Sequence, residues 1–158
     1  MVMSLNVGEK APDFALVNQE NKKISLKDFS GKWLVLYFYP KDNTPGCTIE
    51  GIDFTMLLSE FHRAGAEVVG VSPDSVKSHC NFQEKQKLKI MLLSDESKEM
   101  LKKYGVWGKK KFMGREYDGV LRTTFLIDAK GKIAQIWREV SVKGHAREVL
   151  EKLLENKK

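Results

Sequence analysis

Apolar and polar residues alternate along the chain in blocks that match strands and helices in turn. Residues 33–39 are continuously apolar or aromatic, as expected for a central strand that is covered on both faces. Residues 48–63 instead repeat apolar side chains at intervals of three and four, which predicts a helix with one buried face (Phe54, Leu57, Leu58 and Phe61). Gly65 follows as a helix stop signal.

The rest of the chain continues this alternation. Two short alternating segments, 13–17 and 23–26, flank a polar turn and predict a hairpin near the N-terminus. Further strands are expected at 67–72, 91–93, 122–128 and 132–138, and further helices at 75–87, 97–104 and 143–155. Residues 107–117 are predicted to form a loop. This order predicts an α/β fold with a mixed central sheet, and we expect one domain over residues 1–158.

Composition favours a water-soluble protein. The 158 residues are 42% apolar and 30% charged, and no apolar run approaches the roughly 20 residues that a membrane helix needs. Residues Met1 to Asn6 are too few and too mixed for a signal peptide, so we expect a cytoplasmic protein without membrane contact. Two cysteines in a chain of this size do not form a disulfide scaffold, which leaves catalytic, redox-active or buried roles for them.

The net charge of +6 raises the hypothesis of nucleic-acid binding. However, Lys109 to Lys111 is the only compact basic run inside the chain, and no basic stripe or nucleic-acid motif accompanies it. A solvated basic loop is the simpler interpretation, and a positive potential could also attract small anions or an acidic reductase. We therefore predict no nucleic-acid partner.

Neither a metal nor a cofactor is expected. The three histidines, His62, His79 and His145, are scattered and do not form a metal-ligand spacing with the cysteines. No glycine-rich phosphate loop is present, and no Cys-x-x-Cys pair suggests a disulfide oxidoreductase.

The strongest candidate for chemistry is the segment 40–50, where the central strand passes into the first long helix. Thr44 suits the N-cap and Pro45 the first helical position, so Cys47 falls in the first turn. Unpaired amides and the positive end of the helix dipole favour a thiolate there, and the thiolate is the nucleophile. A free cysteine is also commonly a small, buried and inert residue, and the spacing alone leaves both interpretations open.

These residues resemble a known family. The pattern Pro40-x-x-x-Thr44-x-x-Cys47 resembles the active-site motif of the peroxiredoxins. The longer segment 38–50 is similar to the peroxiredoxin Q branch, also called bacterioferritin comigratory protein. The resemblance extends over nearly the whole chain, through the segments 8–14, 26–32, 70–75, 93–95 and 122–131. It implies a thioredoxin-like fold, in agreement with the alternation of strands and helices.

The resemblance also implies a reaction. Cys47 would attack the nearer oxygen of hydrogen peroxide or an alkyl hydroperoxide and become a sulfenic acid. The Thr44 hydroxyl would donate to the peroxide, and Pro40 would shield the pocket of the thiolate. Both residues also have simpler roles, Thr44 as the N-cap and Pro40 as the end of the strand, and neither role excludes the other.

Two charged residues complete the implied site. Arg122 would reach Cys47 from a distant part of the sequence, where its charge favours the thiolate and its fork can donate to the peroxide oxygens. Glu50 lies on the same helical face as Cys47 and would orient Arg122. The alternatives are a surface arginine and an ordinary glutamate of the first helical turn.

A second thiol must regenerate Cys47, and here the sequence departs from a common pattern. Many members of the branch carry the resolving cysteine five residues after the first, but Ile52 occupies that position. By resemblance Cys80 becomes the resolving residue; the alternative is a core residue one turn from Val76. A disulfide needs Cα atoms within about 7 Å, so we expect the helix starts at both cysteines to unwind during turnover.

We therefore predict a thiol peroxidase that forms an intramolecular Cys47–Cys80 disulfide and is recycled by thioredoxin or a similar thiol reductant. A monomer or weak dimer is expected. One alternative is a one-cysteine peroxidase in which Cys80 is structural. Another is a non-catalytic thioredoxin-like redox sensor or binding domain.

Overall fold

The computed structural model describes residues 5–157, so most of the Met1 to Asn6 segment lies outside the described residues. Four α-helices are found, α1 (Pro45–Arg63), α2 (Val76–Gln86), α3 (Glu99–Lys103) and α4 (His145–Asn156), with a short 3-10 helix η1 (Leu26–Phe29). The strands are β1 (Ala15–Asn18), β2 (Lys23–Ser25), β3 (Trp33–Phe38), β4 (Ala66–Ser72), β5 (Met91–Ser94), β6 (Trp107–Phe112), β7 (Arg115–Val120), β8 (Thr123–Ile127) and β9 (Ile133–Arg138).

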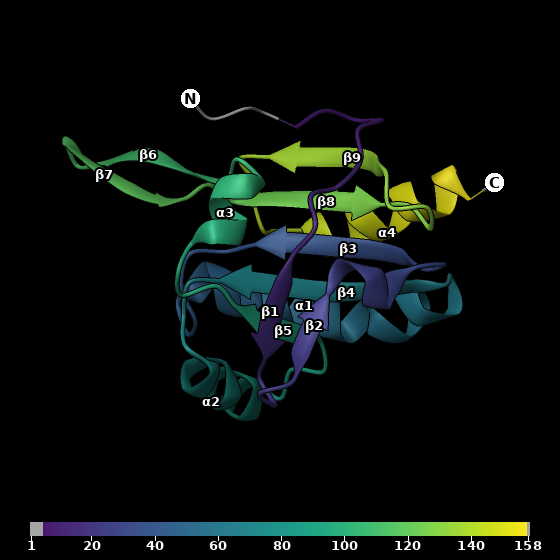
Figure 1. The fold of residues 1–158 in the computed structure, drawn as a ribbon. Helices are drawn as coiled ribbons and strands as arrows, with labels where there is room; N and C mark the ends of the chain where they lie inside the picture. Colours follow the sequence, from purple (N-terminus) through teal and green to yellow (C-terminus); the bar gives the residue numbers. More distant parts are fainter. Residues whose placement is uncertain (1–4, 158) are drawn as a thin grey trace.

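Seven of the strands form one mixed sheet in the order β2-β1-β5-β4-β3-β8-β9 (Figure 1). Strand β3 pairs in parallel with β4 and antiparallel with β8, so the apolar run has a neighbour on each side. The N-terminal hairpin of β1 and β2 joins the sheet through β5. The predicted α/β fold with a mixed sheet and an N-terminal hairpin is therefore confirmed.

The side chains of strand β3 are buried on both faces of the sheet. Its alternate residues Val35 and Tyr37 belong to a core shared with α1 and α4. The residues between them, Leu34, Leu36 and Phe38, belong to a second core on the other face, which includes side chains of α3. Burying such a side chain stabilises the fold by about 1.5–3 kcal/mol. The continuously apolar sequence follows directly from this double burial.

Helix α1 is the longest helix and carries the candidate site at its start. It begins at Pro45, three residues earlier than the periodicity alone predicts, because Thr44 is still extended (φ −86°) and Pro45 occupies the first helical position. Its apolar side chains Phe54, Leu58 and Phe61 are buried as predicted. It ends at Arg63, and Gly65 follows with a φ of +78° that favours glycine.

The prediction of a loop at 107–117 is wrong. Strands β6 and β7 form a separate two-stranded hairpin with a tight turn at Met113 (φ +51°) and Gly114 (φ +79°). The hairpin extends away from the main sheet (Figure 1), so most of its side chains are exposed or half-buried and no apolar alternation marks it in the sequence. Within the hairpin only Val120, at its base, is buried, so backbone pairing rather than side-chain burial defines most of these two strands.

Helix α4 covers the face of the sheet that α1 also covers. Val149, Leu150 and Leu153 are buried in the core, whereas Leu154 is 47% exposed. No helix among residues 5–157 is long and apolar enough to span a bilayer.

Candidate active site

The candidate site forms where β3 ends and α1 begins. Cys47 is the third residue of α1 and is only 1% exposed, so its sulfur is enclosed by protein. The amides of this first turn have no acceptor within the helix, and the positive end of the helix dipole lies here. This environment favours a negative charge on sulfur.

Arg122 is brought to this helix start by the sheet. It directly precedes β8, whose first residue Thr123 pairs with Phe38 at the end of β3. One guanidinium nitrogen, Nη2, lies 2.9 Å from Cys47 Sγ and donates to it. The other, Nη1, donates to Glu50 Oε1 at 3.0 Å. The fork therefore joins two side chains of the same helix while remaining 20% exposed.

Glu50 is almost completely buried beneath this arginine, with 2% of its side chain exposed. Burial raises the pKa of Glu50 to about 7, and the charge and hydrogen bond of Arg122 oppose that rise. Glu50 therefore holds Arg122 most strongly when the carboxyl is ionised, above neutral pH.

Gly46 has no side chain, and the guanidinium of Arg122 lies beside the space that a side chain would fill. A Cβ atom at this position would lie 3.0 Å from Arg122 Nη2, and the guanidinium is already held by Cys47 and Glu50. The group that approaches the backbone at Gly46 is therefore the guanidinium of Arg122.

Thr44 and Pro40 lie on the loop between β3 and α1. The Thr44 hydroxyl donates to the carbonyl oxygen of Lys41 at 2.8 Å and makes no hydrogen bond to the first turn of the helix. Thr44 does occupy the N-cap position of α1, as predicted, but its hydroxyl closes the loop and does not accept a hydrogen bond from an amide of the helix. Pro40 is half-buried and lies two residues after the last residue of β3, Phe38, at the point where the strand gives way to the loop.

Cys80 lies on α2 and is exposed, beside an open groove that Lys87 and Leu88 help to line. The interpretation of Cys80 as a core residue is therefore wrong: the neighbouring His79, rather than Cys80, faces the interior. Both cysteines are free thiols, one buried and one accessible to solvent.

Lys110 is a residue near the site that the sequence does not reveal. It lies half-buried on β6, and burial together with the nearby charge of Arg122 lowers the pKa of Lys110, against a smaller opposing effect of Cys47. The residue stands within a run of three lysines, and only the hairpin, which was predicted as a loop, distinguishes it from the others.

Among residues 5–157, one group of side chains has metal-like spacing, formed by Asp42, Asp74 and His79. Both ring nitrogens of His79 lie against acceptors, Nδ1 at 2.8 Å from Asp42 and Nε2 at 2.9 Å from the carbonyl oxygen of Leu93. A metal ligand must offer a free lone pair, and here both ring nitrogens already face oxygen atoms of the protein. We interpret the group as a buried hydrogen-bond network.

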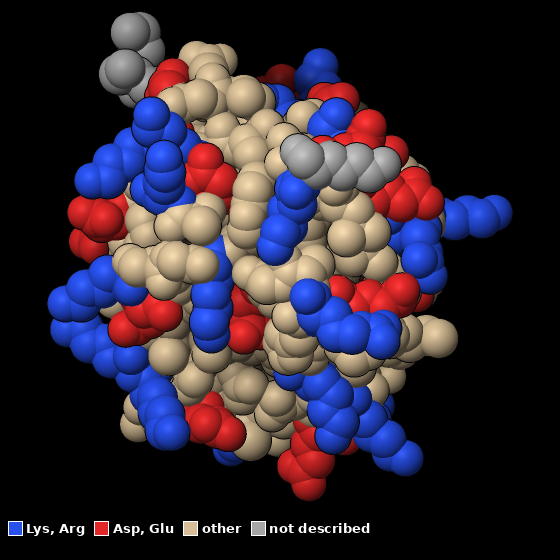
Figure 2. Space-filling view, turned by 90° about the vertical axis from the view of Figure 1, so that its right-hand side faces the viewer, with Lys and Arg blue, Asp and Glu red and all other residues tan. Residues whose placement is uncertain are grey.

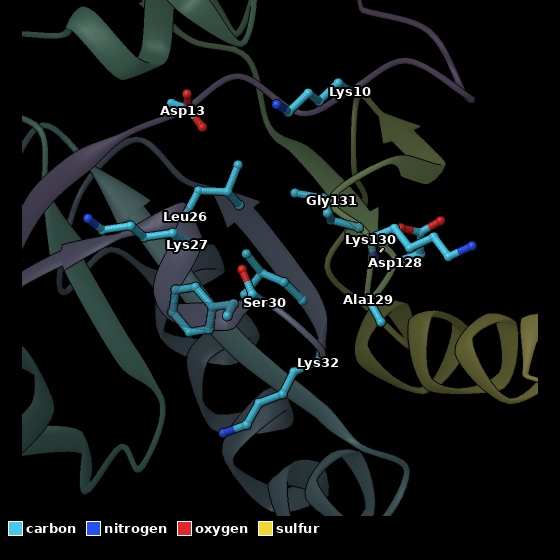
Figure 3. A pocket seen from close by; sticks show the side chains of 13 residues that line it. Lys10, Asp13, Leu26, Lys27, Ser30, Lys32, Asp128, Ala129, Lys130 and Gly131 are labelled. Atoms are coloured by element: carbon cyan, nitrogen blue, oxygen red, sulfur yellow. Dashed lines mark hydrogen bonds between the residues drawn. The ribbon is translucent and has the colours of Figure 1, made fainter.

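A cavity of about 260 Å³ lies at the other end of the sheet, near the start of β3 and the β8–β9 turn (Figure 3). Lysines surround it, among them Lys10, Lys27 and Lys130, but it holds no cysteine or histidine. The strand that leads to Cys47 begins here and runs away from this cavity, so the cavity is separate from the candidate site.

Charge is distributed without a continuous basic stripe on the face seen in Figure 2. Lysine and arginine side chains are interspersed there with acidic ones. On the hairpin, Lys109 and Lys111 similarly lie across from Asp118 and Glu116. This mixture favours a solvated surface over a nucleic-acid interface.

Comparisons with known proteins agree with this geometry. Residues 7–136 match the model of the AhpC/TSA family. A Helicobacter pylori relative that carries the name peroxiredoxin bcp is 49% identical over 149 residues, which cover 94% of this chain and 98% of the relative. The peroxiredoxin Bcp of Bacillus subtilis is 44% identical over 151 residues, 96% of each chain.

Solved structures give the same result. Peroxiredoxin Q of Xylella fastidiosa, solved as a cysteine-to-serine mutant, superposes with a TM-score of 0.94 at 40% identity over 99% of both chains. The bacterioferritin comigratory protein of Xanthomonas campestris, described for its alkyl peroxide reduction activity, superposes with a TM-score of 0.88 at 44% identity over 92% of both chains. The fold is therefore thioredoxin-like. The chain belongs to the AhpC/TSA family, in its peroxiredoxin Q branch, and is a peroxidase that uses peroxide substrates and a thiol reductant.

Proposed function

We propose that Cys47 is the peroxidatic residue and that Arg122 is its main electrostatic partner. The Cys47 thiolate attacks one oxygen of the peroxide, the O–O bond breaks, and Cys47 becomes a sulfenic acid. The leaving oxygen takes a proton and departs as water or an alcohol. Charge develops on that oxygen in the transition state, so donors placed beside it lower the barrier.

The other site residues have positioning and binding roles. The ionised Glu50 fixes the orientation of the Arg122 fork through its 3.0 Å hydrogen bond. The Thr44 hydroxyl turns from the Lys41 carbonyl to the peroxide when substrate binds, which exchanges one hydrogen bond for another. Pro40, without an N–H, closes the loop side of the site and helps to keep water from the thiolate.

Cys80 resolves the sulfenic acid. Its thiol attacks the sulfur of Cys47, a disulfide forms, and the hydroxyl of the sulfenic acid leaves as water. The exposed position of Cys80 supports this role because the thiol is free to move toward its partner. The buried position of Cys47 requires that the start of α1 opens as well.

A dithiol protein of the thioredoxin type then reduces the disulfide by two thiol–disulfide exchanges and returns both cysteines to thiols. The positive net charge of the chain favours an acidic reductant, since opposite charges speed association. We expect this cycle to run in the reducing cytoplasm, with the chain as a monomer or weak dimer.

The observation that carries this proposal is the 2.9 Å contact between Arg122 and Cys47. Its test measures peroxide consumption with thioredoxin, with dithiothreitol, and in Cys47→Ser. Peroxide consumption must cease in Cys47→Ser and persist with either reductant in the native chain. Undiminished turnover in Cys47→Ser would overturn the assignment.

Mass spectrometry after one equivalent of peroxide tests the role of Cys80. The native chain should contain a disulfide between residues 47 and 80, whereas Cys80→Ser should accumulate sulfenic acid, and sulfinic acid once a second equivalent is added. A native chain that accumulates these acids without a disulfide would be a one-cysteine peroxidase.

A further inference from the structure

Helix α2, which carries Cys80, is held to the protein by few contacts. Of its eleven residues only His79 and Phe82 are buried. Phe82 lies against the ring of Tyr39 in the apolar core, and His79 makes the buried polar contacts of the helix. A helix with so few buried side chains opens locally at low cost, and the opening is governed by the contacts it must break.

Both ring nitrogens of His79 are engaged in buried hydrogen bonds. Nε2 lies 2.9 Å from the carbonyl oxygen of Leu93, which can only accept, so this nitrogen carries a hydrogen. Nδ1 lies 2.8 Å from Asp42 Oδ2, which also accepts from the Ser78 hydroxyl at 2.7 Å. The Tyr39 hydroxyl donates to Oδ1 of the same carboxylate at 2.6 Å. Asp42 and His79 thus form a buried pair at salt-bridge distance, with the hydroxyls of Ser78 and Tyr39 as further partners of the carboxyl group.

Asp42 belongs to the loop that leads to Cys47, five residues further along the chain. Its backbone amide donates to Asp74 Oδ2 at 2.8 Å, so the loop is also tied to the segment just before α2. The Asp42–His79 ion pair therefore joins the loop before one cysteine to the helix of the other. Neither segment can move far without breaking the same contact.

We propose that Asp42 and His79 are positioning residues for disulfide formation: they hold both cysteine segments in the folded arrangement, and their separation opens both segments together. The inference rests on the resolving role of Cys80 proposed above. While the pair is intact, Cys47 stays beside Arg122 and reacts with peroxide. Once it separates, Asp42 is solvated, α2 loses its polar anchor, and Cys80 becomes free to reach the sulfenic acid.

The lifetime of the ion pair then decides the fate of the sulfenic acid. A long-lived pair keeps Cys47 beside Arg122, where a second peroxide converts the sulfenic acid to sulfinic acid. A short-lived pair favours attack by Cys80 and release of water. Weakening the pair should therefore accelerate disulfide formation and protect the enzyme from overoxidation at high peroxide.

Single-turnover experiments on His79→Gln and Asp42→Asn test this inference. The reduced variants are mixed with one equivalent of peroxide, quenched with acid at intervals, alkylated, and analysed by mass spectrometry for sulfenic acid, sulfinic acid and disulfide. We expect disulfide formation to be about tenfold faster than in the native chain, because the buried charge that remains destabilises the folded segments. The sulfinic fraction at excess peroxide should fall correspondingly.

The matched control is Ile133→Ala, which removes a buried side chain from β9 at the opposite end of the sheet. It lowers the global stability without touching the ion pair, and its disulfide rate should change less than about twofold. An equal acceleration in this control, or none in His79→Gln, would overturn the inference. Tyr39→Phe, which removes one donor from Asp42, replaces His79→Gln if that variant does not fold, with an expected acceleration of about twofold.

Hydrogen exchange separates this inference from the role of Cys80. In the reduced native chain, amides of α2 and of residues 42–47 should exchange through one common opening, and Asp42→Asn should accelerate both sets by the same factor. Independent exchange of the two sets would refute the shared contact, whatever disulfide forms. Common exchange without a 47–80 disulfide would refute the role of Cys80, and with it the role of the pair in disulfide formation, but it would leave the shared opening of the two segments intact.

Discussion

Arg122 is the residue on which the site depends, and it is fixed from three sides. Cys47 and Glu50 accept from its two terminal nitrogens, and the backbone of Gly46 leaves no space for it to move toward the helix. A rigid fork has little entropy left to lose when it binds peroxide, so its position contributes directly to the rate.

Gly46→Ala should slow the peroxidase without unfolding the protein. Alanine suits the first turn of a helix, but its Cβ would stand 3.0 Å from Arg122 Nη2 and displace the guanidinium from the sulfur. We expect the rate constant for peroxide reduction to fall about tenfold or more, with the urea midpoint almost unchanged. Stopped-flow peroxide kinetics and urea denaturation check the two parts; an unchanged rate would show that Arg122 has room to adjust.

Ionisation of the buried Glu50 carboxyl should lower the stability of the folded protein near neutral pH, although the residue supports peroxide reduction. Its pKa is raised in the folded state, so between about pH 4.5 and 7 the unfolded chain releases a proton that the folded chain keeps. The protonated Glu50 carboxyl therefore contributes fully to the unfolding free energy below pH 4.5, and this contribution is lost as the pH rises through 7. Glu50→Gln should gain up to about 3 kcal/mol in unfolding free energy relative to the native chain over this range, yet reduce peroxide more slowly.

Urea denaturation of both chains at pH 4.5 and 8 measures this difference. If the unfolding free energies of native protein and Glu50→Gln stay parallel across the two pH values, the carboxyl does not titrate as described.

At the scale of elements, the first residue of α4 is a buried histidine that contacts the sheet. His145 Nε2 lies 2.8 Å from the Thr124 hydroxyl on β8, and the rings of Phe54 and Trp137 meet it edge-on. Burial lowers the pKa of His145, and Glu148 opposes this effect. Protonation of the ring would place a charge in this apolar junction between helix and sheet.

The junction should weaken in acid. Because the pKa of His145 is lowered on folding, the unfolded chain binds a proton first as the pH falls below about 6.5, and this part of the stability is lost. We expect the native protein to lose more unfolding free energy than His145→Gln between pH 7 and 5. Thermal unfolding of both chains over that range is the measurement, and equal losses would contradict it.

In contrast to the buried start of α4, the tip of the β6–β7 hairpin is exposed to solvent. Phe112 is 65% and Met113 87% exposed, whereas Val120 at its base is buried. The double change Phe112→Ser and Met113→Ser should alter the unfolding free energy by less than about 0.5 kcal/mol. Val120→Ala, the matched change at the base, should cost about 2 kcal/mol. Urea denaturation that ranks the two variants in the reverse order would show that the tip packs against the protein.

For the molecule as a whole, the sequence predicts those strands and helices whose side chains are buried in a regular pattern. The run at 33–39 and the repeated apolar residues of α1 identify a covered strand and an amphipathic helix, because each pattern reflects one geometry of burial. The β6–β7 hairpin escapes prediction for the same reason, since its strands bury almost nothing.

The contacts of the site residues are harder to predict from their spacing in the sequence. Arg122 stands 75 positions after Cys47, and only the resemblance to a family suggests that the two residues meet. Asp42 and His79 have no sequence signature, because their contact arises from the packing of α2 against the loop before α1. The hydroxyl of Thr44 can accept from an amide of the first helical turn or donate to a carbonyl oxygen, and the local backbone places it where it donates to Lys41.

The two sulfur atoms differ in exposure, and this difference has a practical consequence. A bulky maleimide added to the reduced protein meets Cys80 at the surface, while Cys47 is enclosed behind Arg122. Brief labelling should therefore mark one thiol per chain and leave a protein that still consumes its first peroxide but cannot close the disulfide. Such a half-blocked enzyme would report the chemistry of the first sulfur in isolation, with no change to the genetic sequence.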